Sequence, residues 1–140
     1  MSATSLALTE HYDAPAAKLF QAWSDPAIIP KWFTASPENT KTMVPEFDFK
    51  VGGAFKIDMV MPDGSHNIAA GKFLEIVKDK KISMSWRWLE SPMAHNAPYD
   101  SVLTITLAAA GGGTDLTLTH EKLADQTDVD NHTGGWQMML

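Results

Sequence analysis

The stretch ISMSWRW at residues 82–88 alternates large apolar side chains with serine and arginine. Successive side chains of a β-strand point to opposite faces of the sheet, so this alternation predicts a strand with one aromatic face and one polar face. The apolar face carries Ile82, Met84, Trp86 and Trp88.

The same period of two recurs on both sides of this stretch. Phe47 and Phe49 share one face, and Gly52-Gly53 turns the chain into a second apolar series at Phe55, Ile57, Met59 and Met61. Glycine and aspartate tolerate the backbone angles of tight turns, so the turns mark where each strand ends. The pattern predicts strands at 44–49, 54–61, 66–77, 82–88, 103–107 and 116–120. It places turns at Gly52-Gly53, Asp63-Gly64, Lys78–Lys81 and Gly111–Gly113. It also predicts a bulge at Gly71 and a Pro-rich loop at Glu90–Pro98.

The segment before these strands predicts one more strand and two short helices. Leu6 and Leu8 alternate with Ala7 and Thr9, as in an amphipathic strand. The helix Ala16–Ser24 places Leu19, Phe20 and Trp23 on one face, and Asp25-Pro26 starts a second helix that Pro30 keeps to one or two turns. Ile28, Ile29, Trp32 and Phe33 give this second element a large apolar surface, for which core packing is favoured over ligand contact.

The last segment predicts a helix. Thr127 and Asp130 form a variant of the capping box, and Val129, Thr133, Trp136 and Leu140 follow at spacings of about one turn. Gly134 and Gly135 weaken a helix by about 1 kcal/mol each relative to alanine. No C-cap follows Leu140, so we expect this helix to be short or truncated, with either a more open interior or a cover supplied by a second copy.

Composition narrows the class of protein. The 140 residues suit one domain, the absence of cysteine fits a reducing compartment, and cytoplasm is the default location. A net charge of −6, from 11 Lys+Arg against 17 Asp+Glu, opposes binding to nucleic acid or an anionic membrane. The longest apolar runs are too short to span a bilayer, so membrane insertion is not expected. Five Trp, six Phe and eight Met suggest an interior that adapts to variable contents.

In this order, the elements and a set of short motifs resemble the SRPBCC or START-like superfamily, and within it the family related to the C-terminal domain of the Hsp90-ATPase activator. The motifs are Ala14-Pro15, Phe20–Trp23, Asp25-Pro26, Lys31–Phe33, Gly52-Gly53, Gly71–Ile76, Trp86–Trp88, Gly113–Glu121 and Gly135-Trp136. The resemblance implies an α+β helix-grip fold over residues 1–140. In this fold a curved antiparallel sheet of six to seven strands surrounds a C-terminal helix, two short helices follow the first strand, and a deep cavity lies between sheet and last helix.

The resemblance implies no single function, because relatives include lipid carriers, polyketide cyclases, antibiotic-resistance proteins and co-chaperone domains. We favour binding or carriage of a small hydrophobic or aromatic molecule. The alternatives are a cyclase-like or hydrolytic enzyme and an interaction module that contacts Hsp90. The interaction module ranks last, because the chain lacks the further chaperone-binding domain of the full co-chaperone.

The predicted ligand cavity combines inward side chains of the strands with side chains of the helices. These residues are Trp32, Phe55, Ile57, Met59, Met84, Trp86, Trp88, His120 and Trp136. Arg87 and Lys72 fall on the opposite face, and Glu46, Asp48 and Asp58 are expected to point outward.

His120 is the one weak candidate for catalysis. It alternates with Leu116 and Leu118 and therefore points inward, where a neutral imidazole could bind a ligand or transfer a proton. A core histidine with a hydrogen-bonding partner is the more common outcome. The other histidines lack the spacing of metal ligands, and no phosphate loop, dinucleotide fingerprint or nucleophile elbow occurs, so no metal and no cofactor are predicted.

Overall fold

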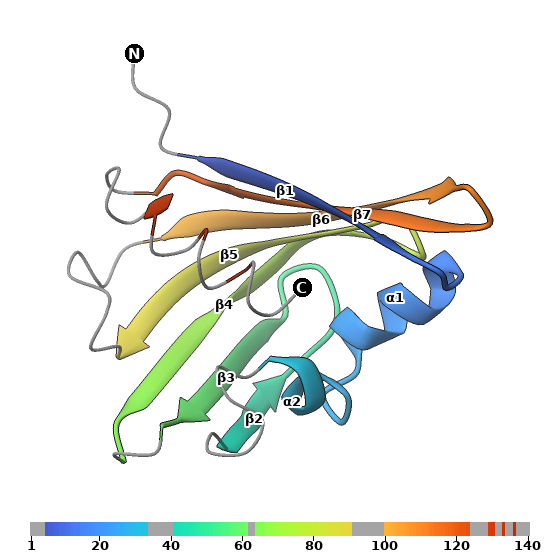
Figure 1. Ribbon diagram of the computed structural model, residues 1–140. Helices are drawn as coiled ribbons and strands as arrows, with labels where there is room; N and C mark the ends of the chain where they lie inside the picture. Colours follow the sequence, from blue (N-terminus) through green and yellow to red (C-terminus); the bar gives the residue numbers. More distant parts are fainter. Residues whose placement is uncertain are drawn as a thin grey trace.

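Two short helices and seven strands make up the elements of the described part of the chain (Figure 1). The computed structural model describes residues 5–33, 41–61, 64–90, 100–123, 129–130, 133 and 136, apart from the side chains of Trp88 and Glu90. The elements are β1 (Leu6–Tyr12), α1 (Ala16–Ser24), α2 (Ile29–Trp32), β2 (Lys41–Phe47), β3 (Ala54–Val60), β4 (His66–Val77), β5 (Lys81–Glu90), β6 (Ser101–Ala110) and β7 (Gly113–Glu121). The predicted order of elements is confirmed from the first strand to the seventh, and the bounds of α1 and β4 match the prediction.

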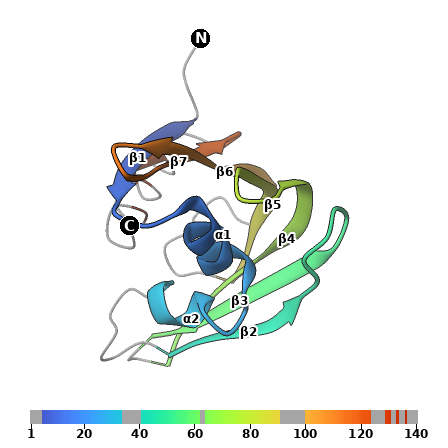
Figure 2. The same ribbon diagram turned by 90° about the vertical axis from the view of Figure 1, so that its right-hand side faces the viewer.

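All seven strands form one antiparallel sheet with the order β1-β7-β6-β5-β4-β3-β2. Strands β2 to β7 follow one another as hairpins, whereas β1 crosses the molecule to pair with β7, from Leu6 opposite His120 to Tyr12 opposite Thr114. Figure 2 shows the sheet curling around α1 and α2, which lie on its concave side. The interior is therefore the space between two helices and a curved sheet.

The curvature has a local cause in β4. Its pairing with β5 shifts register between Ile68 and Ala69 and again between Phe73 and Glu75, and such bulges bend a strand and increase its twist. Gly71, where the sequence predicts the bulge, lies between the two shifts. A Cβ atom there would stand 1.9 Å from the backbone oxygen of Ser85, so the two strands approach more closely at this point than a side chain allows.

The alternation predicted from sequence decides which side chains form the core. Along β3 the inward residues Phe55, Ile57 and Met59 are buried, while their neighbours are only partly covered. The same holds for Trp86 on β5 and for Leu116, Leu118 and His120 on β7, whereas Met84 on β5 is buried next to a buried serine, Ser83. The concave face of the sheet is thus a largely apolar wall that also carries the buried polar side chains of Asn67, Ser101, Thr114 and His120.

The two helices are joined by Asp25. Its backbone N–H donates to the carbonyl of Gln21 (3.0 Å) and so ends α1, while its carboxylate accepts the N–H of Ala27 (2.9 Å). Pro30 lies in the first turn of α2, where a missing N–H costs nothing. The second helix is short, as predicted, but it begins at Ile29 and not at Asp25-Pro26, so Pro30 lies at its start and does not limit its length.

Near the C-terminus, Val129, Asp130, Thr133 and Trp136 are helical, and Val129 and Trp136 are buried. The Thr133 hydroxyl donates to the Val129 carbonyl at 2.7 Å, one turn back. Thr127, Gly134, Gly135 and Leu140 lie outside the described residues, so the extent of the C-terminal helix stays a prediction.

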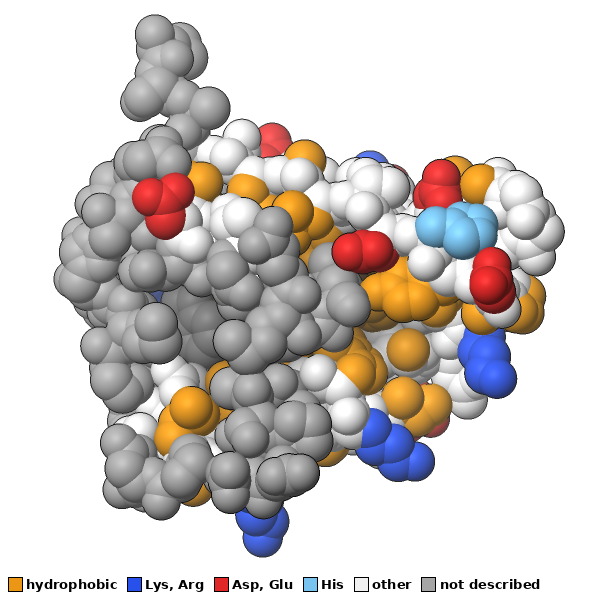
Figure 3. All heavy atoms as spheres, viewed as in Figure 1, with side chains coloured by type: hydrophobic (Ala, Val, Ile, Leu, Met, Phe, Trp, Pro, Cys, Tyr) orange, Lys and Arg blue, Asp and Glu red, His pale blue; other side chains and the backbone are white. Residues whose placement is uncertain are grey.

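Charged groups stand outside this core. On the face shown in Figure 3, the described Lys and Arg side chains stand apart from one another and form no basic patch. In the described part of the chain no helix is long and apolar enough to cross a membrane. Nor do three or more His, Asp or Glu residues gather there in an arrangement that could hold a metal ion.

The edge pair of β1 and β7 carries a pH-dependent contact. His11 Nδ1 lies 2.7 Å from the Asp115 carboxylate and Nε2 lies 3.2 Å from that of Asp13. The hydrogen bond to Asp115 is the largest cause that raises the pKa of His11 above its ordinary value of 6.5, and partial desolvation acts against it.

We expect the stabilisation from His11 to be fully present below pH 6.5 and to disappear as the pH rises through the raised pKa, because the folded state binds the proton more tightly than the unfolded chain. Urea unfolding of the wild type and His11→Gln at a series of pH values measures this, with the Asp13→Asn variant as a control that removes the weaker partner. A gap between wild type and His11→Gln that widens toward high pH would contradict the expectation.

Candidate ligand-binding site

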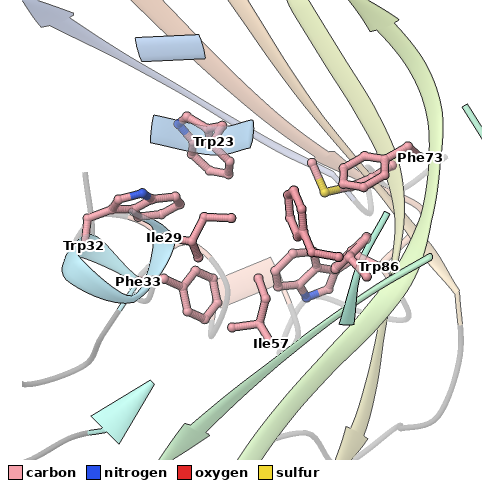
Figure 4. Close-up of a pocket in the computed structure, with 10 residues that line it drawn as sticks. Trp23, Ile29, Trp32, Phe33, Ile57, Phe73 and Trp86 are labelled. Atoms are coloured by element: carbon pink, nitrogen blue, oxygen red, sulfur yellow. The ribbon is translucent and has the colours of Figure 1, made fainter. Parts of the chain in front are cut away.

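A small cavity lies between the helices and the strands β2 to β5 (Figure 4). Its volume is about 20 Å³, which is room for one water molecule rather than for an organic ligand. The described residues that line it are all apolar: Trp23, Ile29, Trp32, Phe33, Phe47, Phe55, Ile57, Phe73, Met84 and Trp86. The aromatic side chains therefore fill most of the concave space themselves.

Five of the nine predicted site residues line this cavity, namely Trp32, Phe55, Ile57, Met84 and Trp86. Met59 is buried on the same face. His120 and Trp136 are buried beside Trp86. The Trp88 side chain lies outside the described part of the structure.

Sequence reasoning missed half of the lining. Trp23 belongs to the apolar face of the first helix and Phe47 to that of a strand. Ile29 and Phe33 belong to the apolar surface of the second helix, so each of the four carried a signal of burial. Phe73 lies among alternating residues of β4, and its sequence signal of burial was weaker. Periodicity indicates that these residues are buried, but it does not show which of them line the same cavity.

The helix side of the cavity is built from two tryptophans. The rings of Trp23 on α1 and Trp32 on α2 lie 4.4 Å apart between centroids, and Figure 4 shows them facing Trp86 and Phe73 of the sheet. The Trp32 indole N–H donates to the Ala22 carbonyl at 2.8 Å, which fixes that ring to the end of α1. Aromatic pairs in such tilted arrangements contribute about 0.5–1.5 kcal/mol beyond their buried area.

His120 belongs to a chain of hydrogen bonds next to the cavity. The Trp136 indole N–H, which can only donate, lies 3.2 Å from His120 Nδ1. Nδ1 is therefore the accepting nitrogen and Nε2 carries the proton, which is donated to the Ser101 hydroxyl at 2.7 Å. The hydroxyl in turn donates to the Trp86 carbonyl at 2.9 Å.

This assignment has a chemical consequence. The imidazole is neutral, fully buried and bonded through both ring nitrogens to groups of the protein. A general base must have a nitrogen within reach of the substrate's proton, so His120 would first have to lose Trp136. The three carboxylates that were expected to point outward, Glu46, Asp48 and Asp58, do not line the cavity.

Comparison with known proteins shows which family this chain belongs to. The model of the family described as "Activator of Hsp90 ATPase homolog 1-like protein" matches residues 13–140. The chain belongs to this family. The resemblance to Hsp90-ATPase-activator relatives that the sequence motifs indicated is thereby confirmed.

Solved structures of similar proteins share the whole fold. Protein CV1439 from Chromobacterium violaceum is 30% identical, with a TM-score of 0.84 over 97% of this chain and 91% of that one. A protein from Plasmodium falciparum described as an HSP90 activator, PFC0360w, is 25% identical, with a TM-score of 0.72 over 97% of this chain and 89% of that one. The family fold is thus confirmed along nearly the full length of the chain.

One similar protein from the fission yeast Schizosaccharomyces pombe is described as uncharacterized. It is 33% identical over 92 residues, which make up 64% of this chain. The chain spans only 23% of the length of that relative.

The hydrogen-bond chain predicts the effect of one substitution. We expect Ser101→Ala to lower the free energy of unfolding by about 1–3 kcal/mol, because the change takes a partner from both the His120 imidazole and the Trp86 carbonyl in the core. Ser83→Ala on the neighbouring strand is the matched control, since that serine's hydroxyl lies 3.2 Å from the Thr104 hydroxyl instead. Urea unfolding compares the two, and equal losses would contradict a special role for Ser101.

Proposed function

We propose that this protein binds a small hydrophobic or aromatic molecule in the interior between its helices and its sheet. The observation that carries the proposal is the cavity, whose described walls are entirely apolar and come from both layers of the fold. Apolar pockets lined by aromatic side chains are typical sites for small ligands.

The volume of 20 Å³ requires that the walls move apart when a ligand enters. The walls are suited to such movement because Met84 is flexible and polarizable. The helix side of the cavity is also short, since α2 has only four residues. Binding in this way selects an expanded state of the interior that is a minor state of the free protein.

An enzymatic role for His120 has less support, because both of its ring nitrogens are already engaged within the protein. The cytoplasmic location and the cover by a second copy remain predictions from the sequence.

Methyl NMR tests the binding proposal. A panel of naphthalene, 2-naphthol, indole and 1-decanol should shift the Met84 methyl resonance, which reports on the cavity, and should leave that of Met43, which is 39% exposed on β2, unchanged. Ile57→Phe adds volume inside the cavity and should weaken binding about tenfold. Leu74→Phe is the matched control, since Leu74 is 49% exposed. If no compound moves the Met84 methyl, the proposal is wrong.

A second candidate function is the activation of an Hsp90 chaperone. It is favoured by the family match over residues 13–140 and by the similarity to the P. falciparum HSP90 activator. We expect the purified chain to raise the ATPase rate of Hsp90 in a coupled assay, and a chain unfolded by heat serves as the control. An unchanged ATPase rate, together with no binding in calorimetry, would rule this function out for the chain on its own.

A further inference from the structure

The indole of Trp136 is packed against the walls of the cavity. Its ring centroid lies 5.5 Å from that of Trp86, 5.9 Å from Phe33 and 6.0 Å from Trp23, and all three of these residues also line the cavity. Movement of this one side chain would therefore join the space that it occupies to the existing cavity. That space has the shape of a planar bicyclic ring.

The polar group beside Trp136 is fixed by the sheet and not by Trp136 itself. His120 stands on β7, and its Nε2–H is held by Ser101 on β6, which is held in turn by the backbone of β5. This arrangement sets the ring's tautomer and leaves Nδ1 as an acceptor toward Trp136. The Nδ1 lone pair is thus presented to whatever group occupies the position of the indole.

The contact that Trp136 makes with this acceptor is long. The distance of 3.2 Å from Nε1 to Nδ1 lies at the upper end of the range for N–H···O hydrogen bonds, although here the acceptor is a nitrogen, and the Nε2–Oγ contact on the other side of the imidazole measures 2.7 Å. A hydroxyl donor forms shorter bonds, typically about 2.7–2.8 Å to an oxygen acceptor. A ligand with a phenolic O–H could therefore satisfy His120 at least as well as Trp136 does.

From these contacts we propose that Trp136 occupies the ligand's place in the free protein, and that the ligand is a neutral planar aromatic molecule whose single O–H or N–H donor replaces the indole N–H at His120 Nδ1. This inference rests on the proposed binding function and specifies the ligand class for the same interior. An anionic ligand is excluded from the class, because the described walls offer no cationic group and a buried charge without a partner is costly.

The ligand competes with a side chain of the protein, which affects the measured affinity. Only protein molecules in which Trp136 has left its position can bind, so the apparent dissociation constant equals the intrinsic constant divided by the fraction of molecules in that state, and is therefore larger. Removing the indole N–H while keeping an aromatic side chain should favour the ligand, because it weakens the competing contact and leaves the His120 acceptor in place.

A pair of probes that differ only in the donor tests this inference in the wild-type protein. We expect 2-naphthol to bind at least tenfold more tightly than 2-methoxynaphthalene, which has the same ring system and no donor. We also expect 2-naphthol to move the Trp136 indole N–H resonance in ¹⁵N-labelled protein. The Trp32 indole N–H, which is bonded to the Ala22 carbonyl, should keep its hydrogen-bonded character.

Two matched variants separate the effect of the indole N–H from that of cavity shape. Trp136→Phe should raise the affinity for 2-naphthol, because the ligand no longer has to displace the indole N–H from His120, and the preference for 2-naphthol over 2-methoxynaphthalene should persist. Trp32→Phe makes the same chemical change at a tryptophan that lines the cavity and does not bond His120, so it should not raise the affinity for 2-naphthol. Circular dichroism and urea unfolding check that each variant is folded.

The outcomes distinguish this inference from the proposed function. Equal affinities for the two probes, with the Met84 methyl shifted and the Trp136 N–H unmoved, would overturn the inference and leave the binding function intact. Binding of neither probe, with the Met84 methyl unmoved, would overturn both.

Discussion

The packing of Trp86 at the centre of the concave face is the contact on which the rest of the structure depends. The side chain is 2% exposed and meets Phe33 after α2, Phe55 on β3 and Trp136 from the C-terminal segment. Its backbone carbonyl anchors Ser101 and through it the buried histidine. One residue of the central strand thus joins both layers of the fold and the polar group of the interior.

That central position exists only because the sheet is curved. The two register shifts in β4 and the glycine between them allow the sheet to bend, so that β2 and β3 turn back toward the helices. A flat sheet would place Phe55 and Trp136 too far apart to share a neighbour. The curvature and the aromatic cluster therefore depend on each other.

Sequence reasoning recovered the parts of the fold that depend on local pattern. The alternation around Trp86 and the start and stop signals of α1 are local, so the faces of the strands and the bounds Ala16–Ser24 could be predicted. The pairing of β1 with β7 joins opposite ends of the chain and leaves no trace in periodicity. The resemblance to known relatives supplied the curved sheet, which pattern alone does not contain.

The candidate site divides in the same way. That His120 points inward follows from its alternation with Leu118, whereas its bonds to Ser101 and Trp136 depend on the register of two strands and on the position of a distant segment. The lining residues Trp23 and Phe33 are apolar in sequence, but their meeting with the sheet depends on the angle at which α1 and α2 cross it. The bonds of His120 and the contacts of the lining residues depend on how the helices pack against the sheet. The pattern of a single sequence does not predict that packing.

The free-energy cost of an empty cavity limits how large a binding site can be in the free protein. An unfilled cavity costs about 24 cal/mol per Å³, so the observed 20 Å³ costs only about 0.5 kcal/mol. An empty pocket of about 300 Å³, the lower size for small-molecule sites, would cost about 7 kcal/mol by the same rule. The whole stability of a domain is about 5–15 kcal/mol, so an empty pocket of that size would use most of it. A small domain with an apolar interior is therefore more stable without ligand when its own aromatic side chains fill the space. These side chains then move aside when a ligand binds. The position of Trp136, between the cavity walls and an acceptor fixed by the sheet, meets this requirement.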